Sequence, residues 1–401
     1  MFLALTGLCP WALAADDPFD FNLSDATPTA EERWRLSGFI ETRSRQTLTE
    51  GDWLSNRTYG QAELMHNRGA LRFFAMASAE HDGAKRRYRD PTRVELREAY
   101  VHYDGTAVDV TVGKQRVGWG TADGVSTIDR VNAVDLREPI GNARTAARRP
   151  STLMRVQATT AAGVFDLVWL PRGRDRKLPG YGSPWEPRDL HALRRDARER
   201  GMPLTTDDTE ADEGGIRYVR YGPGLDWGVA YYNGYTDAPT ALRIEGSRLR
   251  LMPERIRTWN VNAAMGFGQS TLRGEVAWTP DYPGPGHYGE RWQYVVGWDR
   301  TLLTNLYVNV QLFRDWMPRG EAIEGGTFAV SNLFFDDTLT AGLRGQWANG
   351  GQLAIEAFLE LQWNDAVEIA VRAMFFDGDA DTPLGDYLDN DFAEVSVRWL
   401  L

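Results

Sequence analysis

The chain has little cysteine, little lysine and no long apolar segment. Cys9 is the only cysteine among 401 residues. Because it lies within the first fourteen residues, disulfides, thiolate catalysis and cysteine-bound metals are excluded from the rest of the chain. Beyond residue 15 no uncharged apolar run approaches the ~18 residues that a membrane-spanning helix needs. Together with a mean hydropathy of −0.44, this excludes a helical membrane protein.

Aromatic residues and glycine are plentiful, with 16 Phe, 15 Tyr, 15 Trp and 40 Gly. Disordered chains are poor in aromatic residues, so this composition excludes intrinsic disorder. The net charge of −11 indicates solubility and argues against nucleic-acid binding. Only three of the 45 basic residues are lysines, and a GC-rich genome would give the same excess of arginine.

The first fourteen residues, MFLALTGLCPWALA, are uncharged and end in Ala12-Leu13-Ala14. This pattern predicts a cleavable secretory signal, although no Lys or Arg precedes the apolar core and the true start could lie elsewhere. Cys9 as a lipidation site is the alternative, and the bulky Leu8 before it argues against that reading. We expect a signal peptide at 1–14, a periplasmic N-terminal segment at 15–32 and one barrel domain at 33–401.

From about residue 33 apolar and polar side chains alternate over segments of 9 to 14 residues, each followed by a turn. Residues 304–314 and 352–363 show the pattern clearly. A period of two is typical of a β-strand with two different faces. A soluble β-sandwich would show the same alternation, but its strands are usually about five or six residues long.

The links between these segments alternate between short and long, as in an outer-membrane barrel with trimmed periplasmic turns and elaborated external loops. The segments number 18, or 16 if Thr327–Phe335 is a loop. The sequence thus predicts an all-β, transmembrane, antiparallel up-and-down β-barrel of about 18 strands. Long links are expected at 83–91, 119–150, 171–214, 236–252, 281–289, 317–325 and 377–389.

Charged residues in mid-strand indicate which face looks into the barrel. An Arg at mid-depth on the lipid face costs roughly 2–4 kcal/mol, so these charges should face inward. The predicted pore-lining residues are Arg72, Arg97, Asp109, Arg116, Arg273, Glu275, Arg344, Glu356, Glu360 and Arg372.

Eight tryptophans lie near strand ends, where a belt at the level of the lipid headgroups would place them. The last strand alternates up to the final residue, with Val395, Val397, Trp399 and Leu401 on one face. It is similar to the C-terminal signal by which the barrel-insertion machinery recognises outer-membrane barrels, although that signal more usually ends in Phe. The tryptophans are Trp34, Trp169, Trp227, Trp278, Trp298, Trp347, Trp363 and Trp399.

The run from Gly113 to Gly120, GKQRVGWG, leaves a strand and enters a loop rich in Asp. Over about 30 residues it resembles a family of uncharacterised Gram-negative outer-membrane proteins and, less closely, the alginate-export barrels. The second resemblance implies an 18-stranded barrel that passes an acidic polysaccharide. No helix follows in a βαβ context, so close backbone packing explains the glycines better than a phosphate site does.

Two long loops could control the lumen. The 119–150 loop has the size to fold inward and narrow the pore, or it could stay outside in solvent. The 171–214 loop holds a predicted helix at 185–200, either a charged lid or, as we favour, a surface helix that pairs with lipopolysaccharide or with its acidic neighbour. The predicted constriction-loop residues are Asp129, Asp135, Arg144, Arg148 and Arg149.

The five histidines show no metal-binding spacing, and no cofactor or metal is expected. His102 faces inward on the predicted phase, as a polar wall residue or, in the alternative of a barrel hydrolase, as part of a catalytic set. We therefore predict a non-enzymatic channel in the outer membrane of a Gram-negative bacterium, for hydrophilic solutes including acidic saccharides. A loop-plugged barrel with a structural or assembly role is the other alternative. The expected partners are outer-membrane lipid, lipopolysaccharide, the insertion machinery and a hydrophilic solute.

Overall fold

The computed structural model describes residues 34–138, 147–206, 211–284, 287–317, 320 and 322–401. The signal peptide expected at 1–14 and the segment expected at 15–32 lie outside the described residues. Within this part of the chain no helix is both long and apolar enough to cross a membrane.

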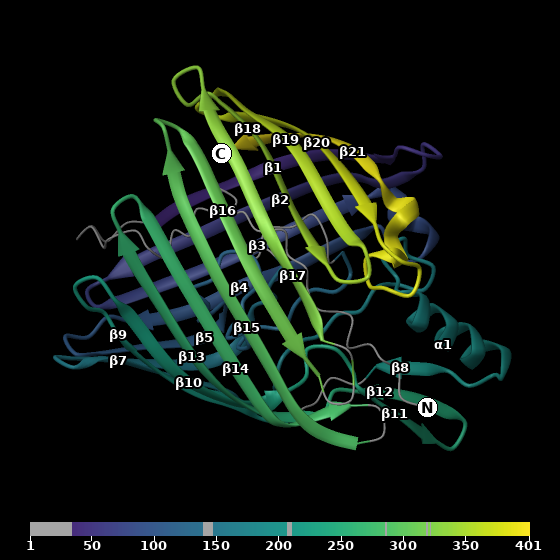
Figure 1. Cartoon of the computed structure of the whole chain (residues 1–401), viewed down its shortest axis with the longest axis horizontal. Coiled ribbons are helices and arrows are strands. Elements are labelled where there is room, and N and C mark those ends of the chain that lie inside the picture. The colour runs from purple at the N-terminus through teal and green to yellow at the C-terminus, as the bar shows by residue number, and fades with distance from the viewer. Residues whose placement is uncertain (1–33, 139–146, 207–210, 285–286, 318–319, 321) are drawn as a thin grey trace.

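Eighteen antiparallel strands form one closed barrel (Figure 1). The barrel closes because β1 pairs with β2 on one side and with the last strand, β21, on the other. This confirms the predicted 18 strands, including the doubtful segment at Thr327–Phe335, which lies largely in β17. The strands are β1 (Trp34–Thr47), β2 (Trp53–Arg68), β3 (Leu71–Asp82), β4 (Thr92–Tyr103), β5 (Val108–Gln115), β6 (Ser151–Thr160), β7 (Gly163–Leu170), β9 (Glu213–Arg220), β10 (Asp226–Tyr235), β13 (Arg255–Phe267), β14 (Ser270–Gly284), β15 (His287–Leu302), β16 (Leu306–Trp316), β17 (Ile323–Phe334), β18 (Leu339–Ala348), β19 (Gln352–Asn364), β20 (Val367–Asp377) and β21 (Phe392–Leu400).

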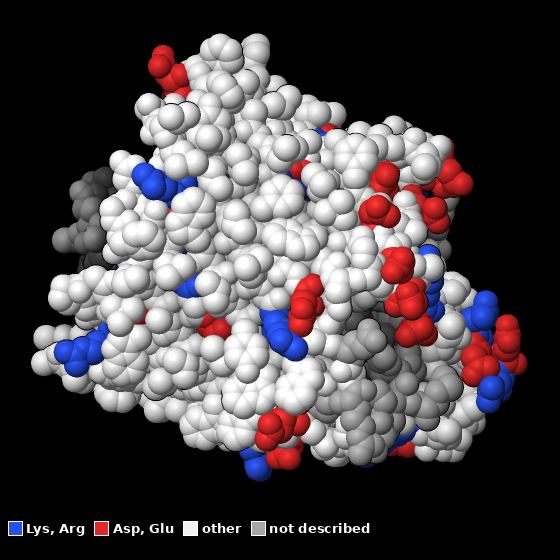
Figure 2. Space-filling model, in the orientation of Figure 1, with Lys and Arg blue, Asp and Glu red and all other residues white. Residues whose placement is uncertain are grey.

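Side chains alternate between the outer face and the interior along the strands. In β13, Trp259 and Val261 are each 53% exposed, whereas the alternating residues Thr258 and Asn260 are buried. Figure 2 shows that the visible outer face is largely uncharged and that most of its acidic and basic side chains gather toward one end. An apolar outer band of this kind suits contact with lipid.

The two ends of the barrel differ in the length of their connections. Short turns such as 69–70, 161–162 and 365–366 lie at one end, together with the start of β1 and the end of β21. The opposite end carries the connections at 83–91, 116–150, 171–212 and 378–391. The long link predicted at 281–289 is wrong, because β14 continues to Gly284 and β15 begins at His287.

A small layer of structure lies beyond the long-loop end, at the lower right of Figure 1. It comprises the helix α1 (Arg188–Glu199) and a three-stranded sheet of β8 (Leu204–Thr206), β11 (Ala241–Glu245) and β12 (Arg248–Met252). Leu190 and Leu193 of α1 pack on Leu251 of β12. The predicted helix at 185–200 is thus confirmed, beginning directly after Pro187. Two short 3-10 helices, η3 (Gly83–Arg87) and η4 (Gly385–Asn390), lie in other long connections.

Candidate functional site

The connection between β5 and β6, residues 116–150, enters the barrel in the part that the structure describes, and we call it the inward loop. Trp119 and Val131 are fully buried and share an apolar cluster with Tyr232 of the wall. Further along, Ala122 packs on Val295 and Phe313 of the wall. The inward loop therefore packs against one side of the barrel wall, which includes β10, β15 and β16.

Glu275 of β14 holds the tip of the inward loop. One carboxylate oxygen accepts hydrogen bonds from the backbone N–H groups of Thr121 and Ala122, at 2.7 and 2.9 Å. The other accepts from the backbone N–H of Thr127 at 2.7 Å and from the hydroxyl of Ser126 at 2.9 Å. Glu275 is only 1% exposed. Its carboxylate is therefore shielded from water and is satisfied by hydrogen-bond donors of the inward loop instead.

The sequence run from Gly113 to Gly120 explains how the chain leaves the wall. Gly113 has a φ of +136°, and a Cβ there would lie 2.2 Å from the carbonyl oxygen of Ala99. Asp129 accepts hydrogen bonds from the backbone N–H groups of Trp119 and Gly120, both at 2.7 Å. These contacts fit the predicted role of the glycines in close backbone packing.

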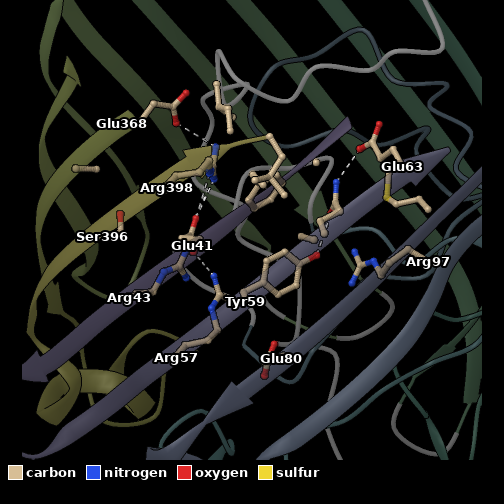
Figure 3. Close-up of a pocket in the computed structure, with 18 of the residues that line it drawn as sticks. Glu41, Arg43, Arg57, Tyr59, Glu63, Glu80, Arg97, Glu368, Ser396 and Arg398 are labelled. Carbon is tan, nitrogen blue, oxygen red and sulfur yellow. Dashed lines mark hydrogen bonds and ion pairs between the residues drawn. The ribbon is translucent and has the colours of Figure 1, made fainter. Parts of the chain in front are cut away.

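A cavity of about 470 Å³ lies between the inward loop and the wall formed by β1–β4 and β19–β21 (Figure 3). Phe39 and Leu401 line it near the short-turn end, whereas Arg89 and Glu138 line it near the long-loop end. The cavity therefore extends along the barrel beside the inward loop.

Arginines and carboxylates alternate along the cavity wall. Glu41 lies 2.5 Å from a guanidinium nitrogen of Arg57 and 3.0 Å from one of Arg398. Arg372 pairs with Glu360 at 2.6 Å. The lining includes ten arginines, Arg43, Arg57, Arg89, Arg93, Arg97, Arg116, Arg137, Arg344, Arg372 and Arg398, and eight carboxylates, Glu41, Glu63, Glu80, Glu98, Asp135, Glu138, Glu360 and Glu368.

At the long-loop end of the cavity, a buried lysine connects the inward loop with β3 and η3 through ion pairs. Lys85 is 2% exposed, and its Nζ lies 2.8 Å from Glu80, 3.4 Å from Asp82 and 2.5 Å from Glu138. Burial by itself raises the pKa of Glu138, but Lys85 and Arg89 outweigh it and hold that pKa well below its usual range. The inward loop is therefore tied to η3 by charge at this end.

The predicted pore-lining residues divide into three groups. Arg97, Arg116, Arg344, Glu360 and Arg372 line the cavity. Arg273 and Glu275 hold the inward loop instead, Arg273 through an ion pair with Asp123 at 3.0 Å. Glu356 is buried against Arg344, Asp109 accepts a hydrogen bond from the backbone N–H of Gly105 at 3.1 Å, and Arg72 faces inward on β3.

The predicted constriction-loop residues also have different roles. Asp135 lines the cavity, and burial raises its pKa despite the neighbouring Arg149. Asp129 stabilises the turn of the loop as described above. Arg148 donates to the carbonyl oxygen of Asn132 at 3.0 Å, and Arg149 pairs with Asp175 at 2.6 Å. Arg144 lies outside the described residues.

Sequence reasoning missed several residues of the cavity. Glu41, Arg57 and Arg398 lie on the polar faces of β1, β2 and β21, so the same alternation could have found them. Glu138 belongs to the inward loop, where no periodic signal marks the residues that reach the cavity.

The described residues include no candidate metal site. They contain no group of three or more His, Cys, Asp or Glu side chains that could hold a metal ion. The imidazole Nδ1 of His102 lies 2.9 Å from the hydroxyl of Thr111 on the neighbouring strand. That contact is consistent with a polar residue of the wall.

The solved structures that are similar to this chain include three outer-membrane proteins of low sequence identity. OccK11 of Pseudomonas aeruginosa is 9% identical, with 92% of this chain and 96% of that chain covered and a TM-score of 0.55. OmpF of Salmonella typhi, solved with daunomycin, is 13% identical over 92% and 98%, with a TM-score of 0.46. A mutant of the Rh. blastica porin is 12% identical over 92% and 100%, with a TM-score of 0.45. The OccK11 similarity supports a porin-like barrel fold.

The family described as "Protein of unknown function (DUF1302)" matches residues 41–290. No curated protein matches the chain.

Proposed function

This chain belongs to the DUF1302 family, and we propose that it is an outer-membrane channel through which hydrophilic solutes pass beside the inward loop. The observation that carries the proposal is the cavity of about 470 Å³ with its charged lining. It extends from Phe39 and Leu401 near one end of the barrel to Arg89 and Glu138 near the other. A polar path through a closed barrel whose outer face is apolar is what such a channel requires.

The orientation follows from the unequal ends of the barrel. Short turns are typical of the periplasmic side, and long loops of the outside. We therefore propose that the small layer of α1, β8, β11 and β12 faces the exterior of a Gram-negative cell. In the same orientation, β21 would present the C-terminal signal to the insertion machinery from the periplasm.

The cavity lining supports a weak preference for anions. Ten arginines against eight carboxylates give a formal balance of +2. Most of these charges are paired within the wall, as Arg372 is with Glu360 at 2.6 Å. Because paired charges largely cancel, the net electrostatic repulsion of cations is small. Paired charges across a polar path can orient hydroxyl-rich solutes, so acidic saccharides are one class of solute that we propose.

A barrel plugged by its own loops is the second candidate function. Lys85 and its carboxylate partners hold the inward loop across the long-loop end of the cavity. If this contact never opens, the protein would serve envelope structure or assembly. We propose no catalytic activity, since the only described hydrogen-bond partner of the inward-facing His102 is Thr111.

Single-channel conductance of the full chain in planar bilayers tests the proposal. We expect steady conductance, and a small anion preference in the reversal potential under a salt gradient. A correctly folded, heat-modifiable barrel that conducts no current would refute the channel and favour the plugged barrel.

A further inference from the structure

A pair of arginines lies on the outer face of β13, where the barrel meets the long-loop end. Arg255 and Arg257 are exposed and share the outward face with Trp259 and Val261. The residue between the two arginines, Ile256, points inward and is 2% exposed. Both guanidinium groups therefore leave the barrel on the side that contacts the membrane.

The position of the pair along β13 corresponds to the edge of the apolar band. The strand has 13 residues from Arg255 to Phe267. At about 3.3 Å per residue and a tilt of about 40°, it rises roughly 30 Å, slightly more than the roughly 25 Å of that band. Arg255 and Arg257 thus lie at the level of the lipid headgroups.

An aromatic belt lies directly below the arginines. Tyr231 of β10 packs on Trp259 with ring centroids 4.6 Å apart, and Trp278 of β14 stacks on Trp292 of β15 at 5.8 Å. Aromatic side chains of this kind mark the boundary between headgroups and acyl chains. Charges placed just beyond such a belt meet the phosphate layer of a membrane.

Neither arginine forms an ion pair with a carboxylate of the described residues. Arg255 donates from Nε to the side-chain oxygen of Asn233 at 2.9 Å and lies over the ring of Tyr235. Arg257 pairs across the strands with Asn233 and makes no ion pair with a described carboxylate. The neighbouring Glu254 already accepts from the hydroxyls of Tyr288, at 2.5 Å, and Thr240, at 2.8 Å.

We propose that Arg255 and Arg257, with Asn233 beside them, bind a phosphate group of lipid A at the outer surface of the membrane. Two arginines two residues apart on one strand are separated by about 7 Å. Both guanidinium groups can therefore reach oxygens of the same phosphate group. Guanidinium groups bind phosphate through paired N–H donors. The choice of lipid A over inner-leaflet phospholipid rests on the orientation given under the proposed function, since the site lies at the long-loop end.

The test compares the full chain with the double variant Arg255→Gln/Arg257→Gln in detergent micelles. Tryptophan fluorescence, which Trp259 and Trp278 should report, is followed while diphosphoryl lipid A, dephosphorylated lipid A, phosphatidylglycerol or inorganic phosphate is added. We expect diphosphoryl lipid A to bind more tightly than the other three. In the double variant its affinity should fall about fivefold for each arginine, or about 25-fold in all.

A matched control removes two outward arginines from the opposite end. Arg220 and Arg300 are exposed near the short turns, so Arg220→Gln/Arg300→Gln should leave the affinity within twofold of the original. Equal affinities of the original chain and the Arg255/Arg257 variant for diphosphoryl lipid A would overturn the proposal. So would equally tight binding of phosphatidylglycerol or inorganic phosphate. This assay measures lipid binding and not current. A barrel that binds lipid A but does not conduct would therefore refute the channel without affecting this proposal.

Discussion

Replacing Glu275 by Gln should release the tip of the inward loop while keeping the size of the side chain. Both carboxylate oxygens accept hydrogen bonds from the loop, and three of the donors are the backbone N–H groups of Thr121, Ala122 and Thr127. The glutamine side chain keeps one oxygen that can accept hydrogen bonds. Its NH₂ group is a donor, so it cannot accept from the backbone N–H groups that the second carboxylate oxygen bound.

The magnitude follows from the bonds that are lost. If the amide nitrogen replaces the oxygen bound by Thr121 and Ala122, two buried N–H groups lose their partner at about 1–3 kcal/mol each. Taking about 3 kcal/mol for the sum, the equilibrium between docked and released loop shifts by about 100-fold. Arg273 and Asn309 still hold Asp123, so we expect transient release.

Hydrogen exchange and single-channel recording together measure this effect. The amides of Thr121, Ala122 and Thr127 should exchange faster in Glu275→Gln by about the same factor of 100, and the current should show additional open-state noise. Glu360→Gln is the control, because Glu360 pairs with Arg372 of the wall and should leave those amides unchanged. Unaltered exchange in Glu275→Gln would refute the role of Glu275 as an anchor.

Three further predictions concern the charged lining, the long-loop end and the lipid face. Arg97→Glu changes the lining from ten arginines and eight carboxylates to nine of each, so the anion preference in the reversal potential should vanish; a preference equal to the original would contradict it. The pKa of Glu138 lies below its usual range because of Lys85 and Arg89, so the stability that it contributes is complete above its unfolded pKa of about 4.3 and is lost as the pH falls further. Conductance should therefore rise below about pH 4, and the rise should be smaller in Lys85→Met, where only the weaker contact with Arg89 remains to be lost. Equal acid responses in both proteins would count against this. Leu343→Arg places a charge on an outer side chain that is 50% exposed and should lower the free energy of unfolding in lipid vesicles by about 2–4 kcal/mol, whereas Gln362→Arg, on the inward face of β19, should change it much less.

Much of the fold could be predicted because each strand carries its own signal. Alternation assigned the outer and inner faces of β13 and β19 without knowledge of any neighbour, since facing depends only on the period of two. The segment at Thr327–Phe335, for which a loop was the alternative, directly follows Gly325 and Gly326. In the structure these glycines lie close to β18, where a Cβ on Gly325 would lie 2.0 Å from the carbonyl oxygen of Trp347. The link at 281–289 was mistaken for a loop because Pro280, Pro283 and Gly284 normally interrupt strands, yet β14 bends there through a register shift between Thr279 and Tyr282.

The candidate site was only partly predictable. Arg97, Arg344 and Arg372 line the cavity as charged residues on inward faces. Glu275 has the same local pattern but lies beneath the inward loop. No sequence period distinguishes the two cases, because the difference depends on which part of the wall the loop covers.

The sequence by itself determined an antiparallel barrel, the number of its strands, the face that each strand turns inward and the end that carries the long connections. These properties are local, since they follow from the alternation of side chains and from the residues that permit tight turns. The tertiary structure alone decided which part of the wall lines the cavity and which part lies beneath the inward loop. The inward loop reaches residues more than 140 positions away in the chain, as Thr121 does with Glu275. Contacts over such distances depend on closure of the barrel, which brings β14 opposite the point where the loop leaves β5.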